Sequence, residues 1–181
     1  TRALASWSLR GGMWSGFPRR EGRGGDLPAA RWGDRSPTRA YSSTDGEMTI
    51  VVLGLGGIGA EVTRRLAPFG PTILGVDPKV TTAPPDVAEL FTPDRLPDLL
   101  PRADATIICA PQTPETAGLF DDAMFARMKP TAFFINIGRG KIVRLAALER
   151  ALAEGRIVGA GLDVFETEPL PADSPLWGME H

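Results

Sequence analysis

The chain has 181 residues and a net charge of -2, with 20 lysines and arginines against 22 acidic residues, one cysteine and one histidine. Single copies of cysteine and histidine exclude an internal disulfide, a cysteine-based metal cage and a site built on two histidines, so we expect no metal centre. The charge gives no argument for a nucleic acid partner, and no apolar run approaches the ~20 residues of a membrane helix, so we expect neither nucleic acid nor membrane as a partner.

Composition changes near residue 48. Residues 1–48 hold eight arginines, no lysine and five acidic residues, whereas residues 49–181 hold 12 basic and 17 acidic residues. The first segment has no sustained apolar period, which predicts an irregular structure. We interpret it as a linker or remnant of a preceding region, a targeting segment for organellar import, or an arm that binds a partner. Residues 49–181 are expected to form the folded domain of a cytoplasmic protein, unless the first segment directs import.

Five short runs after residue 48 predict buried strands, because they are apolar and rich in β-branched residues. They are Thr49–Leu53, Thr72–Val76, Ala105–Ala110, Ala132–Asn136 and Ile157–Leu162. Amphipathic segments between them predict helices. The first of these places Ile58, Val62, Leu66 and Phe69 on one face and ends at Gly70. The others are Asp86–Phe91, Leu96–Leu100, Asp121–Met128, which Asp121 caps, and Leu145–Ala153.

The alternation of fully apolar strands with helices is typical of an α/β fold, in which a parallel sheet is covered on both faces. Between the first strand and the first helix lies Gly54-Leu-Gly-Gly-Ile-Gly59. In such a motif Gly54 makes the tight turn, Gly56 lets a pyrophosphate approach the backbone, and Gly59 packs the helix closely on the strand.

Asp77 ends the second predicted strand 18 residues after Gly59, near the spacing of about 20 expected for an acid that binds the adenosine ribose. A carboxylate there repels a 2'-phosphate, which favours NAD over NADP, although Lys79 could soften that preference. The alternative interpretation is a glycine-rich turn beside a solvated Asp77.

The second half of the chain carries four motifs in a regular order. They are Ala110-Pro-Gln-Thr-Pro-Glu-Thr-Ala-Gly-Leu119, Phe134-Ile-Asn-Ile-Gly-Arg-Gly140, Gly159-Ala-Gly-Leu-Asp-Val-Phe-Glu-Thr-Glu-Pro169 and Pro175-Leu-Trp177. In order and spacing they resemble the D-isomer-specific 2-hydroxyacid dehydrogenases, and the resemblance covers the cofactor domain, residues 49–181.

The resemblance implies a Rossmann-type doubly wound parallel sheet, incomplete at its C-terminal edge because the family's next strand is missing from the sequence. It implies an NAD-dependent oxidoreductase, acting on a CH-OH group, that transfers a hydride between NAD(H) and a 2-hydroxy or 2-oxo acid. The family includes glyoxylate/hydroxypyruvate reductases and phosphoglycerate dehydrogenases, and its cofactor domains commonly pair, so a homodimer is expected.

The resemblance also implies site residues. Arg139 matches the arginine that grips the substrate carboxylate, and Glu168 the glutamate that pairs with a catalytic histidine. Asp163 matches the acid that holds the nicotinamide carboxamide, whereas Glu166 is expected to be solvated or structural. Simpler alternatives are a surface ion pair for Arg139 and a turn cap for Asp163. The expected cofactor contacts are Gly54, Gly56, Gly57, Ile58, Gly59, Asp77, Ala110, Pro111, Thr116, Ile137, Gly138, Arg139 and Asp163.

The sequence departs from the family pattern at two places. Arg144 stands where the family usually has an acid, which puts the cap of the following helix in doubt, because a cation is unfavourable at a helix start. The T-P-H motif, whose histidine exchanges a proton with the substrate, is missing from the sequence, and His181 is either a base in its place or simply a terminal residue. We therefore expect NAD binding with little turnover by this chain.

Two other functions stay open. One is an NAD-sensing, non-catalytic interaction protein of the corepressor kind, with residues 1–48 as its contact arm. The other is a domain for a different adenine-bearing ligand, such as S-adenosylmethionine. Arg139 and Glu168 argue against both, because neither function needs that pair of residues.

Overall fold

The computed structural model describes residues 48–179 of the chain. The predictions for the preceding segment and for His181 concern residues outside this part, and the domain boundary at residue 48 stays a prediction. Within residues 48–179, no helix is long and apolar enough to cross a membrane. The same residues contain no group of three or more potential metal ligands that could hold an ion.

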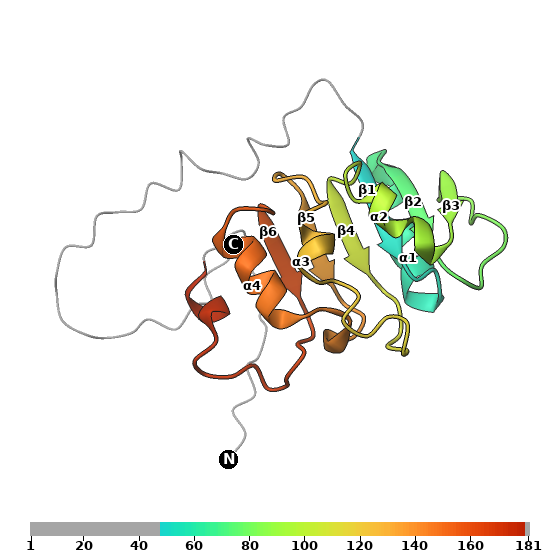
Figure 1. Ribbon diagram of the computed structural model, residues 1–181. Coiled ribbons are helices and arrows are strands. Elements are labelled where there is room, and N and C mark those ends of the chain that lie inside the picture. The colour runs from blue at the N-terminus through green and yellow to red at the C-terminus, as the bar shows by residue number, and fades with distance from the viewer. Residues whose placement is uncertain (1–47, 180–181) are drawn as a thin grey trace, which may run out of the picture. The chain divides into compact units, whose positions relative to one another are not determined.

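The described residues fold around a six-stranded sheet with the order β3-β2-β1-β4-β5-β6, in which every neighbouring pair is parallel (Figure 1). The strands are β1 (Thr49–Leu53), β2 (Thr72–Val76), β3 (Glu89–Phe91), β4 (Ala105–Ile108), β5 (Phe133–Asn136) and β6 (Gly159–Leu162). Because all strands run in one direction, the loops that follow them meet at one edge of the sheet. The order reverses between β1 and β4, which is where ligands of such sheets bind. The predicted Rossmann-type parallel sheet is confirmed.

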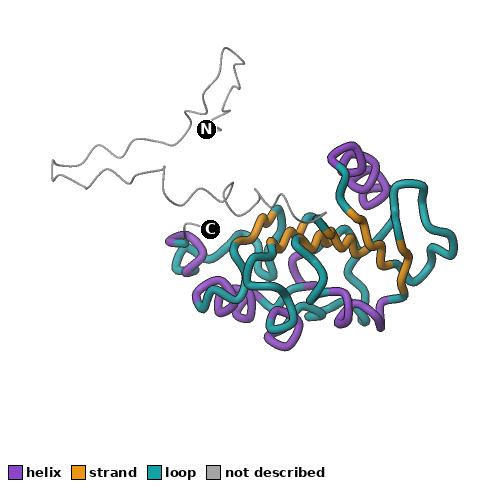
Figure 2. Tube along the Cα trace, turned by 90° about the horizontal axis from the view of Figure 1, so that it is seen from above, coloured by secondary structure: helices purple, strands orange, loops and turns teal. Residues whose placement is uncertain are grey.

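Helices cover both faces of the sheet. They are α1 (Gly57–Leu66), α2 (Leu96–Leu99), α3 (Asp122–Phe125) and α4 (Leu145–Ala153). Figure 2 shows the sheet edge-on, with α1 on one face and α2, α3 and α4 on the other. The predicted cap of α3 is confirmed, because the backbone N–H of Met124 donates to Asp121 Oδ1 at 3.0 Å.

The two faces hold cores of unequal size. Beneath α2, α3 and α4 the three rings of Phe120, Phe125 and Phe134 pack with centroids 4.8 to 5.8 Å apart, and all three side chains are fully buried. The core beneath α1 is smaller and is centred on the other sides of β1, β2 and β4. Strands buried on both faces explain why their sequences are apolar without alternation.

The segment that contains β3 corrects one prediction. A helix was expected over Asp86–Phe91, but Glu89–Phe91 pairs with the edge of β2 in parallel register, with Gly75 opposite Leu90. The backbone N–H of Ala88 also donates to the Ile73 carbonyl at 2.9 Å. A segment this short has no measurable helical period, so pairing with the open edge of the sheet decides its conformation.

Helix α1 corrects a second prediction. Of the four side chains expected on one face, Val62 and Leu66 pack on the smaller core, but Ile58 is 59% exposed and Phe69 is 85% exposed. The helix ends at Leu66 and continues as a 3-10 turn over Ala67–Phe69, and the tighter turn rotates Phe69 away from the sheet. Ile58 lies in the first turn of the helix, next to the glycine turn.

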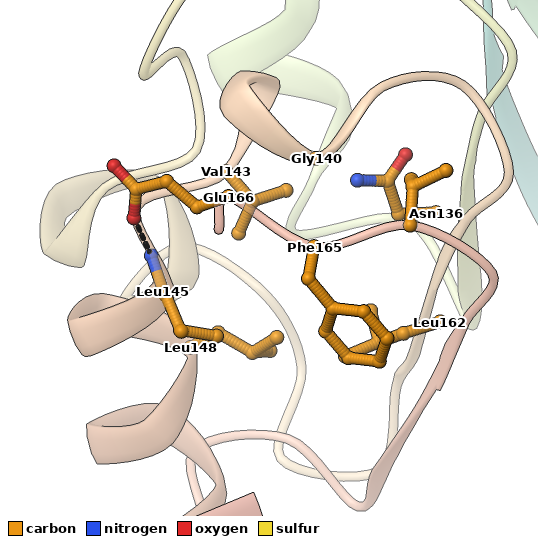
Figure 3. Close-up of a pocket in the computed structure, with 9 residues that line it drawn as sticks. Asn136, Gly140, Val143, Leu145, Leu148, Leu162, Phe165 and Glu166 are labelled. Carbon is orange, nitrogen blue, oxygen red and sulfur yellow. Dashed lines mark hydrogen bonds between the residues drawn. The ribbon is translucent and has the colours of Figure 1, made fainter. Parts of the chain in front are cut away.

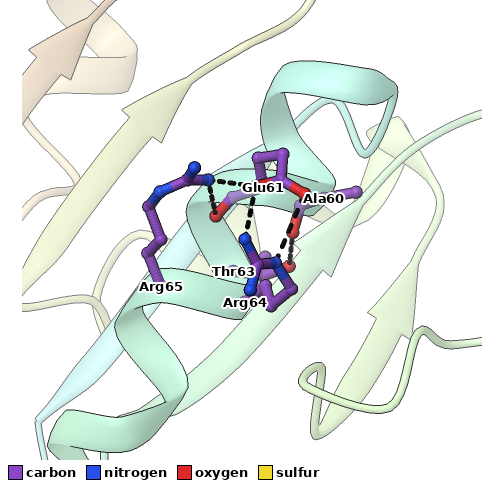
Figure 4. Close-up of polar contacts among 5 residues, drawn as sticks. All are labelled: Ala60, Glu61, Thr63, Arg64 and Arg65. Carbon is purple, nitrogen blue, oxygen red and sulfur yellow. Dashed lines mark hydrogen bonds and ion pairs between the residues drawn. The ribbon is translucent and has the colours of Figure 1, made fainter.

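The outer surface of α1 carries a local group of ion pairs (Figure 4). Glu61 pairs with Arg64 at 2.8 Å and also with Arg65, and both arginines lie about one turn after Glu61. Hydrogen bonds from Arg64 and then Arg65 lower the pKa of Glu61 to about 2. All three side chains are exposed, so this group stabilises the domain only weakly.

Candidate functional site

The glycine turn between β1 and α1 contains two kinds of glycine. Gly54 has a φ of 90°, and a Cβ atom there would lie 2.6 Å from the Ala110 nitrogen. A Cβ atom at Gly59 would overlap the Gly54 carbonyl oxygen. At Gly56 and Gly57, by contrast, a Cβ atom would meet nothing within 4 Å. Two glycines are therefore needed by the fold, while the other two leave open backbone at the start of α1, as a phosphate ligand would need.

Asp77 ties the end of β2 to this turn. Its Oδ2 accepts a hydrogen bond from the Leu55 backbone at 2.8 Å, and its Oδ1 accepts from the backbones of Lys79 at 2.8 Å and Val80 at 3.1 Å. Burial acts to raise the pKa of Asp77, but the three N–H donors outweigh it, so the pKa lies below its ordinary value. The carboxylate is ionised at neutral pH and is fixed beside the glycine turn.

The loop after β4 folds around a threonine hydroxyl. Thr116 Oγ1 donates to the Pro111 carbonyl at 2.9 Å and accepts from the Thr113 backbone at 2.7 Å. Ala110 is buried against Gly54, and burial raises the pKa of the neighbouring Cys109 thiol to about 11. Thr116 thus shapes its own loop, and its predicted contact with a cofactor, like that of Pro111, stays a prediction.

The turn after β5 presents Arg139 and depends on a residue that the sequence analysis gave no role. The side chain of Asn136 is buried, its Oδ1 accepts from the Gly138 backbone and its Nδ2 donates to the Arg139 carbonyl, both at 3.1 Å. Arg139 itself is exposed, with one hydrogen bond from Nη1 to the Gly138 carbonyl at 2.7 Å. A polar residue at the end of a buried strand is the signal that would have singled out Asn136.

Arg139 makes no ion pair with any of residues 48–179, so the interpretation as a surface ion pair has no support there. Its guanidinium keeps most of its donors, which suits bidentate recognition of a carboxylate. No hydrogen bond joins Arg139 to Glu168 within the described part of the chain, although the two residues lie in loops that follow adjacent strands.

The loop after β6 packs against the turn after β5 (Figure 3). The Asp163 backbone donates to the Asn136 carbonyl at 3.0 Å, and a Cβ atom at Gly140 would overlap the Phe165 carbonyl oxygen. Glu168 Oε1 accepts from the Phe165 backbone at 3.0 Å. A small cavity of about 10 Å³, with room for about one water molecule, lies beside the loop and is lined by Asn136, Gly140, Val143, Leu145, Leu148, Leu162, Val164, Phe165 and Glu166.

Glu166 resolves the doubt about the helix that follows Arg144. Arg144 is the N-cap of α4, but its side chain makes no capping hydrogen bond. Instead, Glu166 Oε2 accepts from the Leu145 backbone at 2.7 Å, from 21 residues further along the chain. Of the two predicted alternatives for Glu166, solvated or structural, the structure shows a structural contact.

The parallel strands bring most of the predicted residues to one edge. The glycine turn follows β1, Asp77 follows β2, Ala110 and Pro111 follow β4, and Arg139 and Asp163 follow β5 and β6. Such an edge can hold a dinucleotide along the strand ends, with a cation placed to bind an acid beside it.

Comparisons with known proteins agree with this arrangement. A model of the family "D-isomer specific 2-hydroxyacid dehydrogenase, NAD binding domain" matches residues 24–181. D-3-phosphoglycerate dehydrogenase of Mycobacterium tuberculosis is 43% identical over 158 residues, which are 84% of this chain and 29% of that protein. Glyoxylate reductase/hydroxypyruvate reductase of Homo sapiens is 41% identical over 138 residues, 75% of this chain and 41% of that protein.

Among solved structures, the D-isomer specific 2-hydroxyacid dehydrogenase of Xanthobacter autotrophicus Py2, in complex with NADPH and MES, is similar with a TM-score of 0.69 and 41% identity. The similarity covers 73% of this chain and 42% of that one. The chain thus spans less than half the length of each of these three proteins.

Proposed function

The chain belongs to the D-isomer specific 2-hydroxyacid dehydrogenase family, whose NAD binding domain it contains, and on this premise we propose that it binds NAD(H) as the cofactor half of an oxidoreductase acting on a 2-hydroxy or 2-oxo acid. The observation that carries the proposal is the glycine turn. At Gly54 and Gly59 the surrounding backbone leaves no room for a side chain. At Gly56 and Gly57, by contrast, the backbone at the start of α1 is uncovered. A pyrophosphate is the ligand that such an open helix start binds.

Asp77 supports NAD as the preferred cofactor. Its carboxylate is ionised and held by three backbone donors, so it cannot turn away from a ribose placed along β2. It would accept hydrogen bonds from the ribose hydroxyls and repel a 2'-phosphate, while Lys79 is exposed beside it. We propose that NADH binds more tightly than NADPH.

Arg139 is proposed to hold the carboxylate of the acid. The Asn136 side chain holds the backbone at Gly138 and Arg139, so the arginine starts from a defined position. Glu168 is proposed to orient the proton-carrying histidine that the family resemblance implies, and its carboxylate already accepts one backbone hydrogen bond from Phe165. NAD(H), when bound, supplies or accepts the hydride. A small 2-oxo acid as substrate, a homodimer and a cytoplasmic location stay proposals.

Fluorescence titration of the 181-residue chain with NADH tests the cofactor proposal. We expect saturable binding that NADPH displaces at least about tenfold less effectively than NAD, because the Asp77 charge opposes the extra phosphate. S-adenosylmethionine should not displace NADH. Absence of saturable NADH binding, or preferential displacement by the methyl donor, would overturn the proposal.

A second titration tests the role of Arg139. With NADH bound, oxalate at millimolar concentration should shift the amide resonances of Gly138 and Gly140 in the wild type and in Arg127→Gln, a control at an exposed arginine beyond α3. Arg139→Gln should abolish that shift, because the amide lacks the guanidinium charge. NADH binding without any effect of oxalate would instead favour a protein that senses NAD and performs no chemistry.

A further inference from the structure

Helix α4 (Leu145–Ala153) begins without a cap from its own sequence. The backbone of Arg144 has the extended conformation of an N-cap, with φ of -76° and ψ of 109°, but its side chain accepts no hydrogen bond from the helix. A guanidinium cannot accept one, and its charge is unfavourable beside the positive end of a helix. The Arg144 side chain packs over Gly118 instead, where a Cβ atom would lie 3.2 Å from its guanidinium carbon.

Glu166 supplies the partner that the helix start lacks. Its Oε2 lies 2.7 Å from the Leu145 nitrogen, so an anion from a distant loop satisfies the first N–H of α4 (Figure 3). Both the hydrogen bond and the negative charge favour this end of the helix. The sequence analysis missed this link because no local pattern joins positions 145 and 166.

The loop that carries Glu166 also carries Asp163 and Glu168. Glu166 makes the contact of this loop with the start of α4. Asp163 is held by its backbone at the end of β5, and Phe165 touches Gly140. Asp163 and residues 166–169 are exposed, so burial contributes little to holding the loop. The hydrogen bond from Leu145 to Glu166 ties this exposed stretch to the start of α4 (Figure 3).

We propose that Glu166 is a positioning residue, which caps α4 from outside the helix and thereby holds the loop of Asp163 and Glu168 against the turn of Arg139. The inference rests on the proposed function, since the position of this loop matters for binding only if the edge holds a cofactor. In this chain Arg144 makes no capping hydrogen bond, and the contact from Glu166 at the same helix start links two parts of the candidate site.

The test separates a helix cap from a positioning contact. Four variants of the 181-residue chain are compared: Glu166→Ala, Glu166→Gln, Glu166→Ala combined with Arg144→Ser, and the control Glu154→Gln. Glu154 is an exposed acid that pairs with Arg156 at the other end of α4. Amide hydrogen exchange at Leu145 and Phe165, the thermal midpoint and the dissociation constant for NADH are measured for each, with Leu148 as an internal reference for the folded core.

Glu166→Ala should raise exchange at both Leu145 and Phe165 by about tenfold and weaken NADH binding by about threefold, because the loop loses its anchor. Glu166→Gln keeps an acceptor oxygen, so it should retain most of the protection from exchange and most of the affinity for NADH. Serine at position 144 is a good local N-cap, so the double variant should regain the thermal midpoint but not the protection of Phe165 or the NADH affinity. Glu154→Gln should behave as the wild type.

Two results would overturn the inference. One is a Glu166→Ala variant that lowers the thermal midpoint but leaves Phe165 exchange unchanged, and the other is full recovery of Phe165 protection in the double variant. Either would make Glu166 a helix cap alone. If the wild type fails to bind NADH, the proposed function fails, and exchange at Phe165 still decides whether Glu166 holds the loop.

Discussion

The turn after β1 and the loops after β5 and β6 lie at the same edge of the sheet but are held in different ways. The turn after β1 is closed by backbone packed on backbone, at Gly54 against Ala110 and at Gly59 against Gly54. The Asp77 carboxylate, with three backbone donors, ties the turn to the end of β2.

The buried side chain of Asn136 holds the turn after β5, whereas exposed carboxylates hold much of the loop after β6. Glu166 and Glu168 are both exposed and accept from the backbones of Leu145 and Phe165, while Gly138 and Gly140 approach the backbones of Ala110 and Phe165 closely. Exposed contacts compete with water and are individually weak. The difference indicates that the first region is held by backbone packing and a partly buried carboxylate, whereas the loop after β6 depends on exposed hydrogen bonds and on α4.

Replacement of Gly59 by alanine should break the first region and have the largest effect. The new Cβ atom would overlap the Gly54 carbonyl oxygen, and neither backbone can move without displacing α1 from β1. We expect a loss of about 3 kcal/mol in the free energy of unfolding, measured with urea, together with loss of NADH binding. Gly57→Ala is the matched control, because a Cβ atom there meets nothing within 4 Å and should leave the free energy of unfolding unchanged or slightly higher.

Replacement of Gly140 by alanine should break the second region with a smaller effect. Its Cβ atom would overlap the Phe165 carbonyl oxygen, but the loop after β6 is exposed and can shift away. We expect a loss of about 2 kcal/mol in the same urea experiment, with NADH binding weakened but retained. Gly161→Ala, where the nearest contact would be an ordinary 3.7 Å to Ile135, should change little. A loss equal to that of Gly59→Ala would show that the two regions are equally rigid.

Replacement of Asp77 by asparagine tests the polar part of the first region. The amide loses the charge that three backbone donors stabilise, so the free energy of unfolding at pH 7 should fall by about 1.5 kcal/mol. Because the pKa of Asp77 is lowered in the folded protein, its contribution is complete above the unfolded value and is lost as the pH falls through the folded one. The difference between wild type and variant should therefore shrink below about pH 4. A constant difference from pH 7 to pH 2.5 would contradict this account.

The two regions also differ in how far the sequence predicts them. Gly54, Gly59 and Asp77 were predicted because their residue types and spacing match a known dinucleotide-binding motif. The contact from Glu166 to Leu145 was not predicted, since a single hydrogen bond over 21 residues leaves no periodic pattern.

Two predictions about the fold were wrong because tertiary contacts decided the conformation. The helix expected over Asp86–Phe91 was wrong because so short a segment has no measurable apolar period. Pairing with the open edge of β2 makes Glu89–Phe91 a strand. Phe69 was placed on the buried face because the change from α-helix to a 3-10 turn after Leu66 is not visible in apolar spacing. Where tertiary pairing decides the conformation, local sequence gives no reliable signal.

Replacement of Thr106 by valine should strengthen the β4 strand on which both regions rest. Its hydroxyl oxygen is fully buried and has no hydrogen-bond partner among the described residues. Valine has nearly the same shape and removes the cost of the unpaired hydroxyl, so we expect a gain of about 1 kcal/mol in the free energy of unfolding. The ratio of the effects of Gly59→Ala and Gly140→Ala should stay the same in this background, because β4 supports both. A less stable Thr106→Val variant would mean that the hydroxyl has a partner in solution.

The rate of alkylation of Cys109 should report on how readily the first region opens. Burial raises the pKa of its thiol to about 11, so at pH 8 the reactive thiolate is scarce. We expect iodoacetamide to react about 100-fold more slowly with Cys109 than with free cysteine at pH 8, and the rate to climb until the pH nears the thiol pKa.

Cys109 lies beside the glycine turn, where a Cβ atom at Gly59 would be 3.5 Å from the Cys109 Cβ. Labelling should therefore accelerate in Gly59→Ala and stay unchanged in Gly140→Ala. Equal acceleration in both variants would show that the two regions open together rather than separately.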